Sequence, residues 1–398
     1  MKVLVVTSAP LIQIEGKMLA YAPYVEEMQV WDKYASLSFA SVIWEEQRGL
    51  LVSEIPFNID KVYPLLDFNI KSKKYFFKAV YNSCLNAFFL LKAMRQTDHI
   101  HLRCPGNIGL IGCFVQILFP NKPKTAKFAG NWDPKAKQPW SYRLQKWLLS
   151  NTILTKKMKV LVYGEWPNQT KNIVPFFTAT YSENEIQRHP ELVSGSYEIN
   201  QNQQIATSPT CPERSRRAPR NDGGKINFIF VGALTKGKQP LLSVAVVQKL
   251  KEKGHQVQLD IYGEGPERAA LEKYITENNL IHEVVLHGNC DKESIKKAYQ
   301  SAHFLLFISQ SEGWPKAVAE AMFWGCLPIT SKVSCIPYML ANGERGSLVN
   351  PNADEIVAVI ENYLLYPETY TQQSAKAMQW SRQFTLEKFE EGIGKLLE

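Results

Sequence analysis

Short runs of β-branched and apolar residues alternate with helix-length segments through the second half of the chain, and this periodicity constrains the fold most. The runs occupy residues 226–231, 256–262, 283–287, 304–309 and 327–330. Segments between them, such as 241–253 and 294–302, have helical spacing. Successive parallel strands need a crossover connection, which is usually a helix. The pattern therefore predicts a doubly wound domain, with helices on both faces of a parallel sheet.

A second, less regular alternation fills the first half of the chain. Its strand-like runs lie at residues 3–6, 100–102, 124–129 and 159–163. An amphipathic helix is expected over residues 75–94. With 398 residues, of which 45% are apolar, the chain is long enough to bury two cores. We therefore expect an α/β protein with one Rossmann-like domain over residues 1–182 and another over 225–376.

The stretch between these domains, residues 183–224, has a different composition. From about residue 187 it has few apolar residues and no period, with Asn and Gln at 200–204 and several arginines at 208–220. This predicts a disordered or loosely ordered linker. The arginines could bind an anionic partner, but a solvated linker is favoured because no aromatic residues interleave the basic run. Residues 189–196 and 218–223 look like a translated bacterial intergenic repeat, so we hypothesise a recent insertion without a role in chemistry.

The overall charge narrows the ligand classes without choosing among them. A net charge of +8 suits a phosphate-bearing ligand, an anionic membrane face or nucleic acid. The seven cysteines are scattered, without a C-x-x-C pair or metal-ligand spacing, which predicts reduced thiols in a cytoplasmic protein. We expect neither a signal peptide nor a transmembrane helix, because the longest apolar stretch, 108–119, is too short and is interrupted.

The segment 309–325 carries the clearest chemistry. It follows a strand and opens a helix, with Pro315 at the expected first helical position. Gly313 allows a close approach of the backbone to a ligand. The unpaired N–H groups of the first helical turn and the positive end of the helix dipole favour a diphosphate there. Glu312 precedes the helix and Glu320 lies two turns along it, so both carboxylates can accept hydrogen bonds from sugar hydroxyls.

This segment resembles a known family. Seven residues separate Glu312 from Glu320, and Ala321, Met322 and Gly325 follow. That pattern resembles the retaining GT-B glycosyltransferases of the family 4 (glycosyl transferases group 1) class. The resemblance extends over residues 228–361. It implies two Rossmann-like domains that face each other across a cleft, with a C-terminal helix, residues 377–398, that crosses back to the N-terminal domain.

The resemblance also implies a donor site for a nucleotide-diphosphate sugar. Glu312 and Lys238 match the residues that act on the donor sugar and its phosphates, and Glu320 matches the residue that binds the ribose. Ala233 stands where the family usually has Arg, so Lys236 is a candidate substitute. The remaining donor-binding candidates in this half are Gly232, Gly313, Trp314, Pro315, Lys316, Gly288, Asn289 and Cys290. Trp314 could pack on the sugar or base, or fill an interface.

The N-terminal half matches the family weakly. Gly16 stands near the place of a glycine loop that approaches the donor in relatives. Asn131 follows a strand where relatives often carry a His near the donor sugar. Arg103 ends a strand and could bind the acceptor, although a surface loop is the commoner fate. Lone histidines such as His287 and His303 are interpreted as structural.

The expected function is that of a retaining, hexosyltransferase-type glycosyltransferase, which moves a sugar to a hydroxyl acceptor in cell-surface polysaccharide or glycolipid synthesis. The family requires no metal, and we expect no cofactor and no nucleic-acid partner. Two alternatives remain open: a sugar-nucleotide epimerase, and a catalytically silent GT-B partner subunit. An oxidoreductase is disfavoured, because Arg268 replaces the third glycine of a dinucleotide fingerprint that starts at Gly263.

The acceptor is expected to be a sugar or a lipid-linked sugar. Lys71 to Lys78 and the phenylalanines at 76, 77, 88 and 89 suggest docking on an anionic membrane. A solvated helix start over a buried face is the favoured interpretation of the same residues. The expected location is therefore cytoplasmic, with peripheral contact at the inner membrane face as an option.

Overall fold

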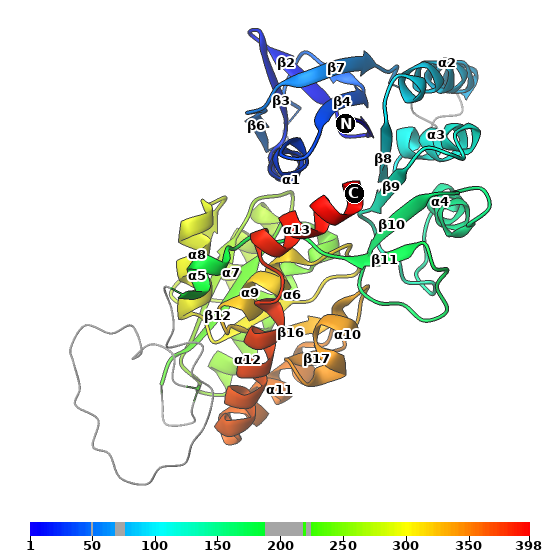
Figure 1. The fold of residues 1–398 in the computed structure, drawn as a ribbon. Helices are drawn as coiled ribbons and strands as arrows, with labels where there is room; N and C mark the ends of the chain where they lie inside the picture. The colour runs from blue at the N-terminus through cyan, green and yellow to red at the C-terminus, as the bar shows by residue number, and fades with distance from the viewer. Residues whose placement is uncertain (49–50, 68–75, 188–217, 220–223) are drawn as a thin grey trace. The chain divides into compact units, whose positions relative to one another are not determined.

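A computed structural model describes residues 1–48, 51–67, 76–187, 218–219 and 224–398 (Figure 1). The chain divides into two compact units. Unit 1 consists of Met1–Phe177 together with Phe389–Glu398, and unit 2 consists of Thr178–Lys388. Each unit has its own sheet and its own hydrophobic core.

The main sheet of unit 1 has the strand order β11-β10-β9-β8-β1-β4-β7, and every neighbouring pair is parallel. Its strands are β1 (Lys2–Val6), β4 (Ser36–Ser41), β7 (Ile59–Pro64), β8 (His99–Cys104), β9 (Lys124–Phe128), β10 (Met158–Tyr163) and β11 (Ile173–Phe176). The central strands β1, β8 and β9 are buried along almost their whole length, as expected for a parallel sheet covered on both faces. The expected strands at 3–6, 100–102, 124–129 and 159–163 correspond to β1, β8, β9 and β10.

A small second sheet in unit 1, with the order β5-β2-β3-β6, was not expected from the sequence. Its strands are β2 (Leu11–Ile14), β3 (Lys17–Tyr21), β5 (Ile43–Trp44) and β6 (Val52–Glu54). A two-residue turn joins β2 to β3, and both of its residues, Glu15 and Gly16, have positive φ. Such turns match the twist of an antiparallel hairpin.

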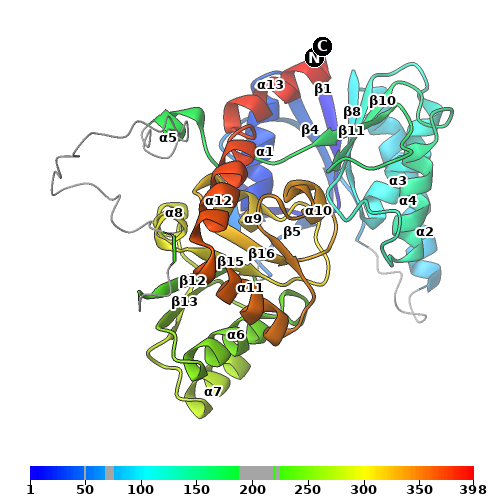
Figure 2. The same cartoon turned by 90° about the horizontal axis from the view of Figure 1, so that it is seen from below.

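Helices cover both faces of the main sheet in unit 1. They are α1 (Ala22–Asp32), α2 (Phe76–Arg95), α3 (Asn107–Val115), α4 (Trp140–Ser150) and the part of α13 (Leu386–Leu397) that starts at Phe389. Helix α3 packs against both α2 and α4, so the three lie side by side (Figures 1 and 2). Helix α13 packs with Phe389 against Phe176, at a ring distance of 5.5 Å.

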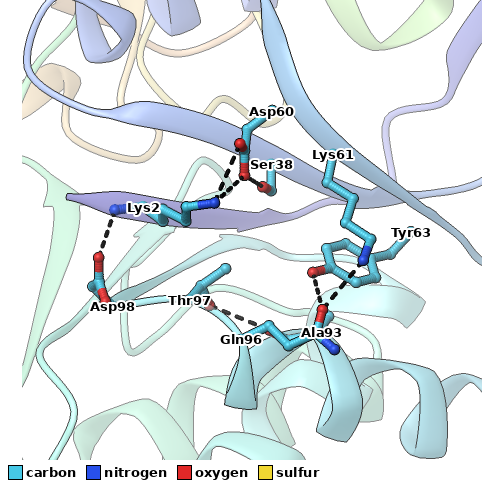
Figure 3. Close-up of polar contacts among 9 residues, drawn as sticks. All are labelled: Lys2, Ser38, Asp60, Lys61, Tyr63, Ala93, Gln96, Thr97 and Asp98. Carbon is cyan, nitrogen blue, oxygen red and sulfur yellow. Dashed lines mark hydrogen bonds and ion pairs between the residues drawn. The ribbon is translucent and has the colours of Figure 1, made fainter.

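Polar contacts near the amino end of the main sheet tie several of these elements together (Figure 3). The backbone N–H of Lys2 donates to the carboxylate of Asp98 at 2.8 Å, and its ammonium pairs with Asp60 at 3.2 Å. At the end of α2, the hydroxyl of Tyr63 donates to Gln96 at 2.8 Å. These groups are largely exposed, so each contact contributes little stability. The network therefore has a structural role at the periphery of the sheet.

The sheet of unit 2 is entirely parallel, with the order β14-β13-β12-β15-β16-β17. Its strands are β12 (Ile226–Val231), β13 (Val257–Tyr262), β14 (Val284–Gly288), β15 (Phe304–Phe307), β16 (Leu327–Ser331) and β17 (Ser347–Val349). The strand order reverses direction between β12 and β15. This is the doubly wound pattern that the sequence predicts, and its switch point lies between those two strands.

The helices of unit 2 pack in two groups. Helix α6 (Pro240–Glu252) contacts α7 (Arg268–Glu277) and α11 (Ala353–Leu365), and together they cover one side of the core. Helix α9 (Lys316–Phe323) contacts α8 (Lys292–Ser301) and α12 (Pro367–Ser381). Short elements complete the unit: α5 (Glu183–Gln187), α10 (Ile336–Met339) and the 3₁₀ helix η5 (Lys236–Lys238).

Two expected segments differ from the observed ones. The single terminal helix expected over 377–398 is broken: α12 ends at Ser381 and α13 begins at Leu386. The side chain of Thr385 caps the new helix by accepting the N–H of Lys388. Of the expected linker, residues 183–187 form α5, and the hypothesised insertion at 188–217 and 220–223 lies outside the described residues.

Candidate functional site

The switch point of the unit 2 sheet brings together the loops that follow β12 and β15. The N–H of Gln310 donates to the carbonyl of Gly237 at 2.8 Å, and the hydroxyl of Ser309 donates to the same carbonyl at 3.3 Å. Ligands of open α/β sheets bind at such a point, because the loops diverge there and leave backbone groups accessible. The candidate site therefore lies at the carboxyl edge of β12 and β15.

An ion pair spans these two loops. The ammonium of Lys238 lies 2.5 Å from a carboxylate oxygen of Glu312, with 26% and 9% of the two side chains exposed. The ammonium also lies 4.9 Å from the centre of the Phe307 ring. Both residues were predicted to bind the same donor molecule, and the structure brings them into direct contact. A partly exposed cation held in this way is available to an incoming phosphate.

Helix α9 starts one residue later than expected. Pro315 precedes the helix in the capping position, with φ −76° and ψ 84°, and Lys316 is the first helical residue. The expectation that Pro315 occupies the first helical position is therefore wrong by one residue. Because proline has no N–H group, this shift removes no donor from the turn. The carbonyl of Gly313 is held by the Ser334 hydroxyl at 3.1 Å, which fixes the loop.

Trp314 is used in packing within unit 2. Its side chain is buried, and its ring lies 6.4 Å from that of Trp380 and 5.9 Å from that of Phe384. These contacts support the filling role that the sequence analysis left open beside a ligand role. They anchor the loop before α9 to the end of α12.

Glu320 has a different set of partners from Glu312. Its carboxylate accepts a hydrogen bond from the Thr180 hydroxyl at 2.7 Å and a longer one from Tyr299 at 3.4 Å. Burial raises the pKa of Glu320, and the Thr180 hydrogen bond and the charge of Lys316 oppose that rise. Thr180, Lys316 and Glu320 line one small pocket of unit 2. Neither Thr180 nor Tyr299 was singled out from the sequence, since both are far from Glu320 along the chain.

Four glycines hold the loops after β12, β13 and β14 against one another. The Gly232 N–H donates to Tyr262 at 2.9 Å, and the Gly263 N–H donates to the carbonyl of Gly288 at 2.7 Å. A Cβ atom on Gly263 would lie 2.0 Å from the Gly232 carbonyl oxygen, and one on Gly265 would lie 2.4 Å from the Leu234 oxygen. Glycine is therefore required there for backbone packing. Gly263 and Gly265 were missed as site-forming residues, although their spacing was noted.

The residues that are candidates for contacts with the nucleotide base and the phosphates differ in exposure. Gly288 is buried with φ +73°, whereas Asn289 is exposed. The thiol of Cys290 lies 3.7 Å from the His287 carbonyl. Lys236 and Ala233 are both exposed on the loop after β12, so a cation at 236 is accessible to solvent.

The two histidines that were interpreted as structural, His287 and His303, have protein partners. His303 accepts the Asn227 N–H at 3.0 Å, which confirms its structural role. His287 pairs with Asp260 at 2.8 Å and stacks on the Tyr262 ring at 4.4 Å.

Two of the donor-binding candidates, Gly16 and Asn131, lie in unit 1. Gly16 is at the exposed tip of the β2–β3 hairpin, so it does not belong to a loop that directly follows β1. Asn131 accepts the Asp133 N–H at 2.8 Å in a local turn, which occupies its carbonyl oxygen. A donor role for either residue stays a prediction.

Arg103 is not on a surface loop. It lies in β8 and pairs with Glu27 at 2.6 Å, and the adjacent Lys127 of β9 pairs with the other oxygen of Glu27 at 2.9 Å. Burial raises the pKa of Glu27, but the charges of Arg103 and Lys127 outweigh it and hold that pKa well below its usual range. Arg103, for which a surface loop was favoured over an acceptor contact, is thus part of a buried ion cluster.

The described residues contain no cluster of three or more His, Cys, Asp or Glu side chains suited to a metal ion. No helix in the described part of the chain is long and apolar enough to cross a membrane.

Comparison with known proteins identifies the region that holds this site. Residues 212–380 match the model of the glycosyl transferases group 1 family, a range that includes Lys238, Glu312 and Glu320. This region is similar to that family. The family domain therefore coincides with most of unit 2 and with the clearest motifs of the sequence.

Individual relatives match over the same part of the chain. The GDP-mannose:cellobiosyl-diphosphopolyprenol alpha-mannosyltransferase of Xanthomonas oryzae is 28% identical over 136 residues, which are 34% of this chain and 35% of that protein. The 2-deoxystreptamine N-acetyl-D-glucosaminyltransferase of Niallia circulans is 27% identical over 164 residues, 40% of this chain and 42% of the relative. The chain thus matches less than half the length of these relatives.

The fold likeness covers the whole chain. HepE of Anabaena, solved in complex with UDP and glucose, superimposes with a TM-score of 0.61 and 13% identity, over 100% of this chain and 99% of the other. At this identity the match concerns the fold alone. The protein has the GT-B fold with two Rossmann-like domains, as the sequence predicts.

Proposed function

We propose that the protein is a glycosyltransferase that moves a sugar from a nucleotide-diphosphate donor to a hydroxyl acceptor. The observation that carries this proposal is the Lys238–Glu312 pair at the switch point, directly before helix α9. It joins a cation for the diphosphate to a carboxylate for the sugar hydroxyls within one family domain. An epimerase would not need this E-G-x-P segment.

In this proposal, Lys238 and the positive end of the α9 dipole stabilise the charge that builds on the leaving diphosphate. The Lys316 N–H donates to the Trp314 carbonyl at 2.9 Å and the Val318 N–H to the Pro315 carbonyl at 3.0 Å, so these two groups are already paired, contrary to the expectation of unpaired donors. Glu312 accepts hydrogen bonds from hydroxyls of the donor sugar and holds Lys238 in place. Glu320 binds the ribose, which requires that the Thr180 hydroxyl releases or shares the carboxylate. Lys236, Gly232, Gly288, Asn289 and Cys290 remain proposed donor contacts, as do Gly313 and Lys316.

We further propose retention of the anomeric configuration and a hexosyltransferase activity that requires no metal. Support for these finer statements comes from the motif resemblance around Glu312 and Glu320. The Xanthomonas relative acts on a diphosphopolyprenol-linked sugar, which favours a lipid-linked sugar as acceptor and a role in cell-surface polysaccharide or glycolipid synthesis. Such acceptors are reached from the cytoplasmic side, with peripheral contact at the membrane.

The test is turnover of a panel of nucleotide sugars by the purified protein, with product analysis by mass spectrometry. We expect release of a nucleoside diphosphate with one donor, and a loss of about 100-fold in Glu312→Gln. The exposed Glu344 of unit 2 provides the control Glu344→Gln, which should keep full activity. Epimerised donor without transfer would indicate the epimerase, and no turnover of any donor would indicate a silent partner subunit.

A further inference from the structure

Helix α2 of unit 1 exposes the residues that a surface helix usually buries. The side chains of Phe77, Tyr81 and Phe88 are 87%, 64% and 61% exposed, and Cys84 lies on the same stripe. Their spacing of three or four residues places them on one face of the helix. Large aromatic side chains in a continuous exposed stripe usually mark an interaction surface.

The buried face of α2 combines core residues, such as Leu90 and Met94, with two polar anchors. Asn86 is fully buried, and its side-chain amide exchanges hydrogen bonds with the backbone of Leu66, both at 2.8 Å. Asn82 donates to the carbonyl of Asp67 at 2.9 Å. The inner face of α2 therefore contains polar anchors for the chain after β7. The outer aromatic stripe, by contrast, is largely exposed to solvent.

The neighbouring helices continue the same surface. On α4, Trp140 and Trp147 are 60% and 58% exposed and lie two turns apart. Phe114 of α3 is also exposed, and α3 packs between α2 and α4 (Figures 1 and 2). Because the three helices cover one side of the sheet, their outer faces form one surface. Leu118 and Ile153, which follow α3 and α4, are exposed as well. We call this surface the aromatic face.

The same part of the chain carries the positive charge of the protein. Residues 76–157 contain thirteen Lys and Arg against two Asp and no Glu, although the whole chain has a net charge of only +8. The exposed cations are Lys78, Lys92, Arg95, Lys135, Lys137, Arg143, Lys156 and Lys157. Helices α2, α3 and α4 themselves contain no acidic residue.

We propose that the aromatic face docks on an anionic membrane surface, with its aromatic rings in the headgroup region and its cations on lipid phosphates. This inference deepens the membrane contact proposed above, because it names the surface that makes the contact, and it would hold for a silent protein as well. Aromatic rings and Lys or Arg are the groups that favour the interface of an anionic bilayer. A second copy of this face is disfavoured because two such faces repel each other. Bases could stack on the exposed rings, but the exposed aliphatic side chains of Leu118 and Ile153 favour the boundary between headgroups and acyl chains over nucleic acid.

The experiment is sedimentation of the full chain with vesicles of phosphatidylcholine, alone or mixed with phosphatidylglycerol. We expect binding to the anionic vesicles only, weakened by salt because the cations are exposed. The variant Arg95→Gln/Arg143→Gln should bind roughly twenty-five-fold more weakly, since each surface cation contributes about fivefold. The matched control in unit 2, Lys273→Gln/Lys376→Gln, also removes two exposed cations and should bind like the wild type.

A second pair of variants tests the aromatic contribution. Trp140→Ser/Trp147→Ser should lose most vesicle binding, whereas Ile281→Ser/Tyr366→Ser, two exposed apolar residues of unit 2, should not. Unchanged thermal melting shows that each variant is folded. Equal binding to neutral and anionic vesicles, or equal binding by the face variants and their controls, would overturn the proposal. The proposal would also be overturned if the face variants lost dimerisation or oligonucleotide binding but still bound the vesicles.

Discussion

The two units of this protein share a parallel, doubly wound design but differ at the carboxyl ends of their strands. In unit 2, glycine loops pack closely against one another there, and the Lys238–Glu312 pair is partly accessible. In unit 1, Arg103 and Lys127 at the ends of β8 and β9 are held by Glu27 in a buried cluster. In unit 1 the charge at the sheet edge is therefore buried in the fold, whereas in unit 2 we propose that it serves a ligand.

The largest stability effect is expected in the buried cluster of unit 1. Glu27→Gln leaves the charges of Arg103 and Lys127 without their counter-ion, which should lower the free energy of unfolding by about 3–5 kcal/mol. Urea unfolding followed by tryptophan fluorescence measures this. The control Glu54→Gln removes the exposed partner of Lys17 and should have little effect. Similar values for the two variants would contradict a structural role for the cluster.

The loop packing of unit 2 provides the next prediction. Gly263→Ala should lower the free energy of unfolding of unit 2 by at least about 3 kcal/mol, because the new Cβ meets the Gly232 oxygen. Gly254 has a positive φ too, but no atom within 4 Å of an added Cβ. Gly254→Ala should therefore cost only about 1–2 kcal/mol. If both cost the same, the close approach of the two loops is not what requires glycine.

Acid should weaken unit 1 through its buried histidines. Burial and the charges of Lys159 and Lys124 lower the pKa of His99 to about 4. The unfolded chain takes up this proton near the ordinary value of about 6.5, so stability falls as the pH drops from about 6.5 toward about 4. Between about pH 7.5 and pH 5 the contribution of His99 to this loss should reach about 2 kcal/mol. Burial also lowers the pKa of His101, which adds to the loss. It is measured by urea unfolding at both pH values, and His99→Asn should reduce the slope. An unchanged slope would exclude His99 as its source.

The smallest effect is expected at Thr180. Thr180→Val removes a hydrogen bond to the half-buried Glu320 and should lower the free energy of unfolding by about 1 kcal/mol. Thr178 lines the same pocket, and its hydroxyl has no hydrogen-bond partner in the described part of the chain. Thermal melting should therefore shift for Thr180→Val and not for Thr178→Val. Equal shifts would show that the bond to Glu320 contributes nothing.

The regular features of the fold were predictable because they repeat. The strands of unit 2 follow the expected runs closely, since buried β-branched segments and helical spacing are local properties. The Glu312 and Glu320 motif was readable for the same reason. The hairpin at Gly16 was not, because its strands are short and its turn depends on two positive φ values.

Pairings across the chain could not be read from the sequence. Thr180 meets Glu320 from 140 residues away, and Glu27 reaches Arg103 only after β8 and α1 have packed. Helix α2 has the expected buried apolar face, with Leu90, Ala93 and Met94 in the core, but the aromatic stripe on its outer face was not expected, because a sequence pattern does not show which aromatic side chains stay exposed. The loop contact of Gly263 was missed because it depends on the neighbouring strand.

The central claim is that the edge of unit 2 binds the diphosphate of a nucleotide sugar through Lys238. Calorimetric titration of UDP, GDP and ADP into the wild type, Lys238→Ala and the exposed control Lys273→Ala tests it most directly. For the nucleotide that binds, Lys238→Ala should raise Kd at least about tenfold, since a charge-assisted hydrogen bond is lost, and the control should leave Kd unchanged. An unchanged Kd in Lys238→Ala would contradict the claim.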